Sequence, residues 1–233
     1  MTTPKDHKRV NDILLGPLER PALQWLAAHS PAWMTPDKLT AIGTFGAFVI
    51  FFSYWASRFN PAFLWLASFG LLINWYGDSL DGTLARYRNI QRPKYGFFID
   101  HTVDGFNEML IVLGLGLSPY VTFNVAAMAL IGYLLLSVFV YVRTFVEGVF
   151  QISYGKFGPT EVRMILFLLN TLMFFWAGAP TFTLPVGQVT VYDLLVGLIA
   201  AVLIGLYVGN TITKARELST IDRPPQSAPP SSK

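Results

Sequence analysis

Four aspartates stand in two otherwise apolar stretches of the chain, and they are the residues best suited to chemistry. Asp78 and Asp81 are three residues apart, and Asp100 and Asp104 are four apart. On a helix either spacing puts both side chains on one face, about one turn apart. If the two helices are antiparallel neighbours, the shallow acids face each other and so do the deep ones. The sequence therefore predicts a box of four carboxylates.

Such a box needs positive charge to balance it. One charged side chain inside a membrane costs on the order of 3 kcal/mol, so four uncompensated ones would cost roughly 10 kcal/mol or more. The two stretches contain no Lys or Arg at the depth of the acids, whereas carboxylate oxygens are the ligands that Mg²⁺ and Mn²⁺ prefer. We therefore expect bound Mg²⁺ or Mn²⁺, with two ions in the box.

Divalent ions held by carboxylates point to phosphoryl chemistry, because they neutralise phosphoryl oxygens and stabilise both oxygens of an in-line displacement. The neighbouring residues agree with this. Gly82 and Ala85 keep the helix wall low beside the acids, and Arg86 offers a planar fork to a phosphate at the rim. Gly96, one turn before Asp100, opens the opposite wall.

Two other interpretations of the aspartates compete with this one. A water-filled polar seam between helices would leave the cost of burying the acids unexplained. A cation channel or a proton-coupled carrier also uses acids inside the membrane. Transport gives no reason for the order Asp-Gly-x2-Ala-Arg, but it remains the alternative from another functional class.

The motif resembles a known signature, that of the CDP-alcohol phosphotransferases, or CDP-alcohol phosphatidyltransferases. Its eight positions are filled here by Asp78, Asp81, Gly82, Ala85, Arg86, Gly96, Asp100 and Asp104. Nine residues separate the two halves of the motif. The segment from Thr35 to Thr40 is similar to the family's usual entry into its first membrane helix.

The resemblance implies a role for each motif position. The implied metal ligands are Asp78, Asp81, Asp100 and Asp104. The implied lining of the cytidine diphosphate pocket is Asp78, Gly82, Ala85 and Arg86. Asp104 would also act as general base on the acceptor hydroxyl, which attacks the phosphorus distal to cytidine so that CMP leaves. The resemblance further implies a homodimer.

The elements that must position these residues are predicted to be membrane helices. The chain has 233 residues, of which 53% are hydrophobic and 13% charged, and it contains no cysteine that could form a disulfide or a zinc site. Apolar runs long enough to cross a bilayer occupy roughly residues 39–57, 61–85, 97–118, 121–146, 161–180 and 189–212. We therefore expect an all-α polytopic membrane protein with six transmembrane helices.

Basic residues indicate the orientation, since cytoplasmic loops carry the excess of Lys and Arg. With six crossings, Arg58 is the single basic residue on one side and the other sixteen fall on the opposite side. Both termini and the active site should then be cytoplasmic. The basic residues flank apolar segments rather than forming a stripe, so we expect no nucleic-acid partner. The compact length favours a bacterial or archaeal cell membrane.

Three regions are expected along the chain. Residues 1–35 should form a cytoplasmic tail and an amphipathic interfacial helix over residues 10–33, broken by Pro17 and Pro21. Residues 36–216 should form the transmembrane catalytic domain. Residues 217–233 have too little apolar surface to fold and should be disordered. No signal peptide is expected, because the first apolar run begins only after Pro36.

The acceptor site is expected on the later helices, near the cytoplasmic side. The candidates for binding the acceptor or a lipid phosphate are Arg143, Lys156, Glu161 and Arg163. Pro159, Thr160 and Glu161 would equally suit the first turn of a helix, and the two arginines could instead mark the interface. Asn74, Asn107 and Glu108 either line an acceptor channel or form internal hydrogen bonds. His101 is expected to pack or hydrogen-bond rather than to bind metal.

Two pairs of substrates fit the predicted reaction. CDP-diacylglycerol with a polar alcohol, such as inositol, serine, glycerol phosphate or inositol phosphate, is ranked first on the size of the chain. CDP-choline or CDP-ethanolamine with diacylglycerol is the alternative, because Thr160-Glu161-Val162 resembles a stretch in choline- and ethanolaminephosphotransferases. In either case the product belongs to phospholipid biosynthesis.

Overall fold

The computed structural model describes residues 8–10, 14–147, 149–151, 158–176, 178, 180–184 and 187–222. These residues form seven helices, namely α1 (Gly16–His29), α2 (Pro36–Ala56), α3 (Phe63–Tyr87), α4 (Pro93–Gly116), α5 (Phe123–Glu147), α6 (Pro159–Phe175) and α7 (Val191–Ile221). Two short strand pairs accompany them. β1 (Lys8–Val10) is parallel to β2 (Val149–Gln151), and β3 (Thr181–Leu184) is antiparallel to β4 (Gly187–Thr190). The prediction of an all-α protein is confirmed.

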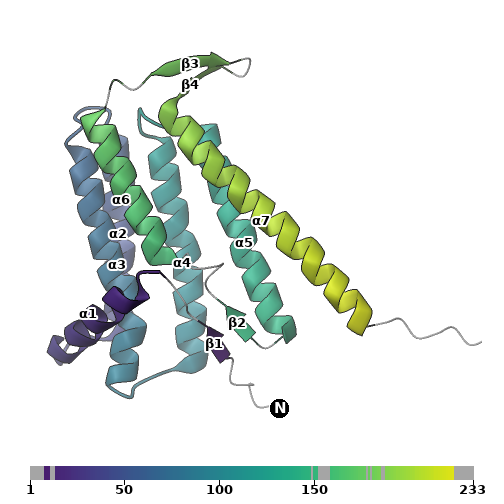
Figure 1. Cartoon of the computed structure of the whole chain (residues 1–233). Coiled ribbons are helices and arrows are strands. Elements are labelled where there is room, and N and C mark those ends of the chain that lie inside the picture. The colour runs from purple at the N-terminus through teal and green to yellow at the C-terminus, as the bar shows by residue number, and fades with distance from the viewer. Residues whose placement is uncertain are drawn as a thin grey trace, which may run out of the picture.

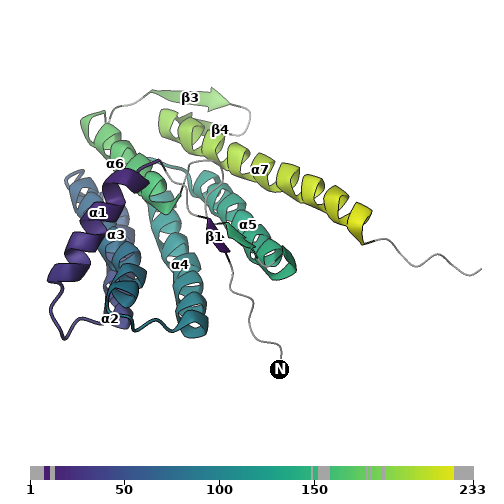
Figure 2. The same cartoon turned by 60° about the horizontal axis from the view of Figure 1, so that its bottom comes forward.

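The long helices form one bundle with a divergent arm (Figure 1). Helices α2, α3, α4 and α6 pack side by side, while α7 packs against α5 and then leans away from the rest (Figures 1 and 2). The short helix α1 packs on α3 and crosses the bundle instead of running along it. The β3–β4 hairpin lies at the opposite end from α1. Each of the six predicted apolar runs thus corresponds to one of the helices from α2 to α7.

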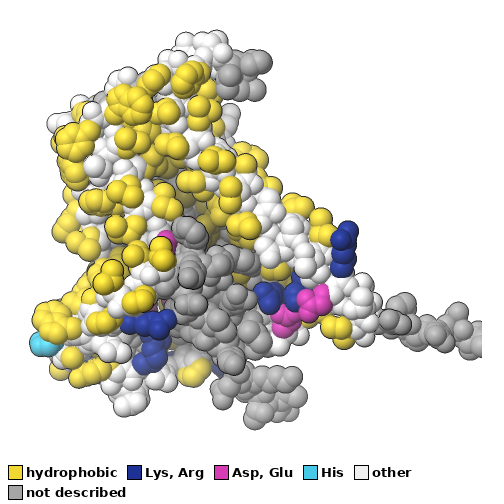
Figure 3. All heavy atoms as spheres, viewed as in Figure 1, with side chains coloured by type: hydrophobic (Ala, Val, Ile, Leu, Met, Phe, Trp, Pro, Cys, Tyr) yellow, Lys and Arg dark blue, Asp and Glu magenta, His cyan; other side chains and the backbone are white. Residues whose placement is uncertain are grey.

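Three of these helices, α2, α5 and α7, are long and apolar enough to cross a membrane. Helices α3 and α4 carry the aspartates, which lower their hydropathy, and α6 has only 17 residues. The helix predicted to run to residue 180 ends at Phe175, and the β3–β4 hairpin follows it. Large hydrophobic side chains cover the flanks of the helices, whereas charged side chains gather mainly in the lower half of the face seen in Figure 3.

Two expectations about the ends of the chain were wrong. Pro17 and Pro21 do not break the first helix, because α1 is continuous through both. Pro17 lies in the first turn, where its missing N–H would have no helical partner, and Pro21 removes a single bond one turn later. Residues 217–221 belong to α7 and are not disordered, since the Lys214–Glu217 ion pair of 2.5 Å supports the last turns. Residues from 223 onward lie outside the described part of the chain.

Close contact between α2 and α3 fixes the position of α3, the helix that carries Asp78 and Asp81. A Cβ on Gly77 would lie 2.2 Å from the Gly43 nitrogen and 2.4 Å from the Leu39 carbonyl oxygen. A Cβ on Gly46 would lie 2.6 Å from the Asn74 nitrogen. These distances are far below any real carbon contact, so only glycine lets the two backbones approach. Within this contact, the Asn74 side-chain amide donates to the Gly43 carbonyl oxygen at 2.9 Å.

Gly77→Ala should therefore destabilise the protein, because its Cβ meets backbone on α2 that has no room to move. We expect a loss of about 1–3 kcal/mol or more from overpacking, measured as thermal or denaturant unfolding in lipid nanodiscs. Gly209→Ala on α7 is the matched control, since nothing lies within 4 Å of its Cβ position. Equal stabilities of the two variants would contradict the close α2–α3 contact.

Candidate active site

A cavity of about 660 Å³ opens among α1, α3, α4, α5, α6 and α7. The four aspartates that the sequence singled out all line it, Asp78 and Asp81 from α3 and Asp100 and Asp104 from α4. Helices α3 and α4 are joined by a short loop and run in opposite directions (Figure 1). The Asp78–Asp81 pair on α3 and the Asp100–Asp104 pair on α4 thus face the same cavity, as the spacing within each pair predicts.

Three of the aspartates lie close enough to share one ion. Asp78, Asp100 and Asp104 each offer a carboxylate oxygen, and these oxygens lie within 4.8 Å of one another. Opposite ligands of a Mg²⁺ ion with bonds of about 2.1 Å would be about 4.2 Å apart. Small side-chain adjustments would therefore bring all three onto one ion. The donor set contains only carboxylates, which suits Mg²⁺ or Mn²⁺.

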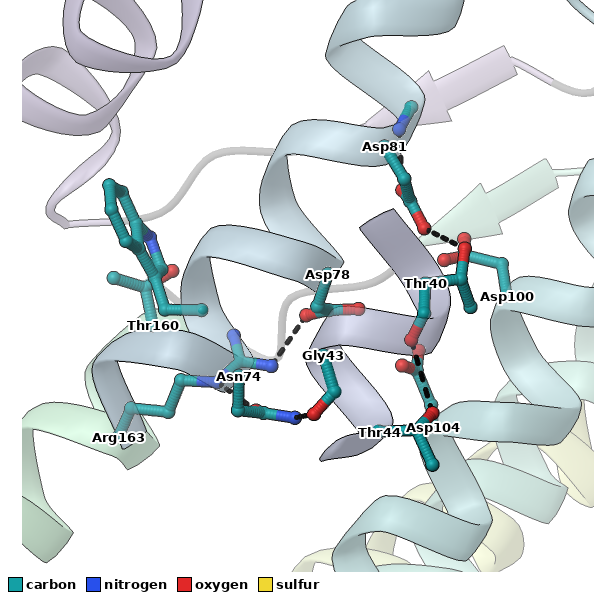
Figure 4. Close-up of polar contacts among 12 residues, drawn as sticks. Thr40, Gly43, Thr44, Asn74, Asp78, Asp81, Asp100, Asp104, Thr160 and Arg163 are labelled. Atoms are coloured by element: carbon teal, nitrogen blue, oxygen red, sulfur yellow. Dashed lines mark hydrogen bonds and ion pairs between the residues drawn. The ribbon is translucent and has the colours of Figure 1, made fainter. Parts of the chain in front are cut away.

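Asp81 has different partners from the other three acids. Its Oδ2 accepts a 2.6 Å hydrogen bond from the Thr40 hydroxyl of α2, and its Oδ1 accepts from the Gly82 backbone N–H. Figure 4 shows the Asp81 side chain lying beside Thr40. Asp81 is buried and does not belong to the three-carboxylate group. The box is thus three converging acids with a fourth held to one side.

Arg163 supplies a positive partner for Asp78 from α6, outside the two aspartate-bearing helices. Its Nη2 is 2.5 Å from Oδ2 of Asp78, and its Nε donates to Oδ1 of Asn74 at 2.8 Å. Both side chains of the ion pair are largely buried, with 14% and 17% of their surface exposed. The second Asp78 oxygen points away from Arg163, toward the side where Asp100 and Asp104 lie (Figure 4). Arg163 therefore orients Asp78 from behind and does not itself line the cavity.

His101 packs as expected and does not bind directly to the acids. Its Nδ1 is 3.8 Å from Asp100 and 3.9 Å from Asp104, which is beyond hydrogen-bonding distance. The ring stacks on Tyr141 of α5 at a centroid distance of 5.3 Å and meets the edge of Phe97 at 4.3 Å. The imidazole therefore fills the space between α4 and α5 beside the carboxylates.

The residues predicted to receive the nucleotide are only partly in the cavity wall. Gly82 and Arg86 line the cavity together with Thr83, whose hydroxyl accepts a 3.1 Å hydrogen bond from Arg86. The Arg86 guanidinium lies over Gly82, with Nη1 3.3 Å from where a Cβ would be. Ala85 and Gly96 are not among the lining residues, and nothing lies within 4 Å of the Gly96 Cβ position.

Helix α1 forms a wall of the cavity, which the sequence did not indicate. It contributes Glu19, Arg20, Leu23 and Gln24. Oε1 of the buried Glu19 accepts from the indole N–H of Trp75 on α3 at 2.7 Å and from the hydroxyl of Thr160 on α6 at 2.8 Å. The sequence feature that could have indicated this wall is Glu19, a single acid on an otherwise apolar face of the helix. Glu19 thus joins three helices at the cavity.

The candidates for the acceptor site have mainly structural partners. Glu161 is buried and caps α6, accepting from the Gly158 N–H at 2.9 Å and from the Leu15 N–H at 2.8 Å. Arg143 pairs with Glu147 at 2.6 Å and does not line the cavity. Lys156 lies outside the described residues. Of the four candidates, Arg163 alone contacts an aspartate of the site among the residues described.

Comparison with known proteins gives one family. The family model described as CDP-alcohol phosphatidyltransferase matches residues 33–204. Cholinephosphotransferase 1 of Bos taurus is 26% identical over 158 residues, which are 63% of this chain and 38% of that protein. Phosphatidylinositol phosphate synthase of Cutibacterium acnes is 34% identical over 86 residues, 37% of this chain and 39% of that protein.

Archaetidylinositol phosphate synthase of Pyrococcus horikoshii is 31% identical over 104 residues, which are 45% of this chain and 52% of that protein. The chain therefore spans from about two fifths to about half of the length of these relatives. The matched family region contains the whole aspartate motif and α2 to α6.

Replacing Arg163 with Met should leave the Asp78 carboxylate buried without its partner. We expect the metal-free protein to lose about 3–5 kcal/mol, the usual effect of breaking a buried ion pair. Added Mn²⁺ should raise the unfolding temperature of this variant more than that of the wild type, because the ion would neutralise the stranded carboxylate. Both effects can be measured by thermal unfolding in EDTA and in Mn²⁺.

Arg143→Met is the matched control, because its partner Glu147 also pairs with Lys214 and the cluster lies outside the cavity. It should change stability by no more than about 1 kcal/mol. If the Arg163 variant were as stable as the wild type in EDTA, Arg163 would not be the partner that Asp78 depends on.

Proposed function

The chain belongs to the CDP-alcohol phosphatidyltransferase family, and from this we propose that it transfers a substituted phosphate from a CDP-alcohol to the hydroxyl of an acceptor alcohol, with release of CMP. The observation that carries the proposal is the convergence of Asp78, Asp100 and Asp104 in a cavity that Gly82 and Arg86 also line. The product would enter phospholipid biosynthesis, as the names of the relatives indicate.

The converging acids fit a divalent ion, Mg²⁺ or Mn²⁺, and two ions remain part of the proposal. Asp78, Asp100 and Asp104 would hold the ion. Asp81 would join them if its carboxylate bound the metal in place of the Thr40 hydroxyl. A bound divalent ion neutralises charge on phosphoryl oxygens. Arg163 keeps Asp78 in place from behind, so that one of its oxygens stays available on the cavity side.

Different residues of the cavity would bind the nucleotide and accept the proton. Gly82 and Arg86 would hold the cytidine diphosphate at the cavity wall, with Asp78 and Ala85 as the other positions of the motif. Asp104 would accept the proton of the acceptor hydroxyl as its oxygen bonds to the phosphorus distal to cytidine. The bond from that phosphorus to the bridging oxygen breaks at the same time, and CMP leaves with that oxygen. Helix α1 would limit the access of water.

One substrate is proposed to be a lipid. Helices α5 and α7 contribute apolar side chains to the cavity wall, namely Leu136 and Val140 from α5 and Leu203 and Leu206 from α7. A lipid could be the donor, as in CDP-diacylglycerol with a polar alcohol, or the acceptor, as in CDP-choline or CDP-ethanolamine with diacylglycerol. The relatives include phosphatidylinositol phosphate synthase and cholinephosphotransferase, so their names agree with both pairings.

The membrane arrangement completes the proposal. Helices α2 to α7 would make six crossings, with α1 in the cytoplasmic interface. There the exposed Leu18 and Trp25 of α1, and Leu14 just before it, can enter the lipid. Both termini and the cavity mouth would be cytoplasmic, in a bacterial or archaeal cell membrane. Residues 36–216 would form the catalytic domain, and the protein would be a homodimer.

Asp104→Asn should abolish turnover while leaving nucleotide binding largely intact, because the amide cannot accept the proton. We expect metal-dependent CMP release to fall by about 10²–10⁴-fold, the usual contribution of a general base. The assay uses purified protein in nanodiscs with Mg²⁺ or Mn²⁺ and both substrate pairings. Asp222→Asn, an exposed acid at the end of α7, is the control and should behave as the wild type.

Undiminished CMP release by the Asp104 variant would remove Asp104 as the base. No CMP from the wild type with any pair, accompanied by ion flux into liposomes, would contradict the transferase and favour a transporter.

A further inference from the structure

Helix α1 lies outside the part of the chain that the family model matches, yet it lines the cavity. The match begins at residue 33, and α1 ends at His29. Arg20 and Gln24 are four residues apart, on one face of α1, and both line the cavity. Neither side chain has a part in the reaction described above.

Glu19 fixes the depth at which α1 meets the site. Its Oε1 accepts from the Trp75 indole N–H at 2.7 Å and from the Thr160 hydroxyl at 2.8 Å. Trp75 is one turn before Asp78 on α3, and Thr160 is one turn before Arg163, the partner of Asp78, on α6. Helices α3 and α6 run in opposite directions (Figure 1), so the two donors lie on either side of the level of Asp78. Glu19 therefore holds α1 at the depth of Asp78.

Two arginines line the cavity at different depths. Arg20 follows Glu19 directly, so it enters the cavity at the level of the converging acids. Arg86 lies eight residues after Asp78, about 12 Å further along α3. These two are the only Lys or Arg side chains among the described lining residues. One cation thus lies at the level of the acids, and the other lies near the end of α3.

Arg20 lies on the opposite side of α1 from the residues suited to lipid. Leu18 and Trp25 are exposed, with 76% and 60% of their surface accessible, and they share one side of the helix. At about 100° per residue, Arg20 is about 140–160° round the helix from both of them. Leu23, which lines the cavity with Arg20, belongs to a buried cluster that includes residues of α3. Arg20 is therefore directed at the cavity and not at the lipid surface.

The charge of the cavity is unfavourable for a diphosphate unless cations contact it. The described lining residues include six acids, namely Glu19, Asp78, Asp81, Asp100, Asp104 and Glu108. Arg163 offsets the charge of Asp78, and a divalent ion on the converging aspartates would offset two further charges. Negative charge still remains, and the diphosphate of a CDP-alcohol adds more. A guanidinium presents a planar fork that matches two phosphate oxygens at once.

We propose that Arg20 binds the phosphate distal to cytidine, which is the one transferred, while Arg86 holds the nucleotide end of the same diphosphate. The inference rests on the proposed function and extends the substrate site to a helix outside the family match. The phosphate that reacts must reach the converging acids, so the cation at their level is the one that contacts it. Arg20 would then also stabilise negative charge on this phosphate during the transfer.

The affinities for CDP, CMP and cytidine identify the phosphate that Arg20 contacts. They are measured by titration calorimetry on the full chain in phosphatidylcholine nanodiscs with Mg²⁺. CMP lacks the distal phosphate, so the ratio of the CDP affinity to the CMP affinity reports the contacts of that phosphate. Arg20→Gln should lower this ratio by about tenfold or more, the effect of losing a charge-assisted hydrogen bond. Arg20→Lys should lower it less, and neither variant should change the cytidine affinity.

Arg92→Gln is the matched control, because Arg92 pairs with Asp37 at the protein surface and does not line the cavity. This variant loses the same charge and should keep the wild-type ratio. The ratio within one variant does not depend on how much of the protein is folded, so it remains informative if Arg20→Gln destabilises α1.

Three results would overturn the inference while leaving the transferase in place. One is an unchanged ratio in Arg20→Gln with CDP still bound. Another is an equal loss of affinity for CDP, CMP and cytidine, which would indicate a distorted cavity. The third is a loss seen only when the nanodiscs contain anionic phosphatidylglycerol, which would assign Arg20 to a lipid headgroup. If the wild type bound none of the three compounds, the proposed function would fail and this inference with it.

Discussion

Burying several carboxylates inside an apolar helix bundle is the constraint on which the rest of this structure depends. The acids that line the cavity are accommodated in different ways. Asp78 is paired with Arg163, Asp81 accepts from Thr40 and Gly82, and Glu19 accepts from two donors on different helices. Asp100 and Asp104 converge with Asp78 as a set suited to a cation. The site therefore depends on how each buried negative charge is paired or hydrogen-bonded, as well as on the positions of the motif residues.

Close helix packing makes this balance possible. Glycines at 43, 46 and 77 let α2 and α3 touch, and this contact brings the Thr40 hydroxyl within 2.6 Å of Asp81. Glu19 and Glu161 tie the N-terminal segment to α3 and α6, so that a helix outside the main bundle closes a wall of the cavity. Small changes in packing away from the converging acids would thus alter the geometry of the cavity.

The charged side chains are distributed unevenly around the cavity. Arg20 and Arg86 line it near the motif residues of α3, whereas Glu108, whose Oε2 has no hydrogen-bond partner among the described residues, lies further along α4.

The sequence by itself determined the helices and which face of each helix the motif acids share, because apolar runs and i, i+3 or i, i+4 spacings act through local geometry. It predicted all six long helices and the meeting of Asp78, Asp81, Asp100 and Asp104 at one cavity. Only the tertiary structure decided that Asp78 pairs with Arg163, which lies 85 residues further along the chain. It also decided that α1 forms part of the cavity wall and that Glu108 and Tyr133 line the same cavity. Those contacts join distant segments, and no local spacing encodes which helix faces will meet.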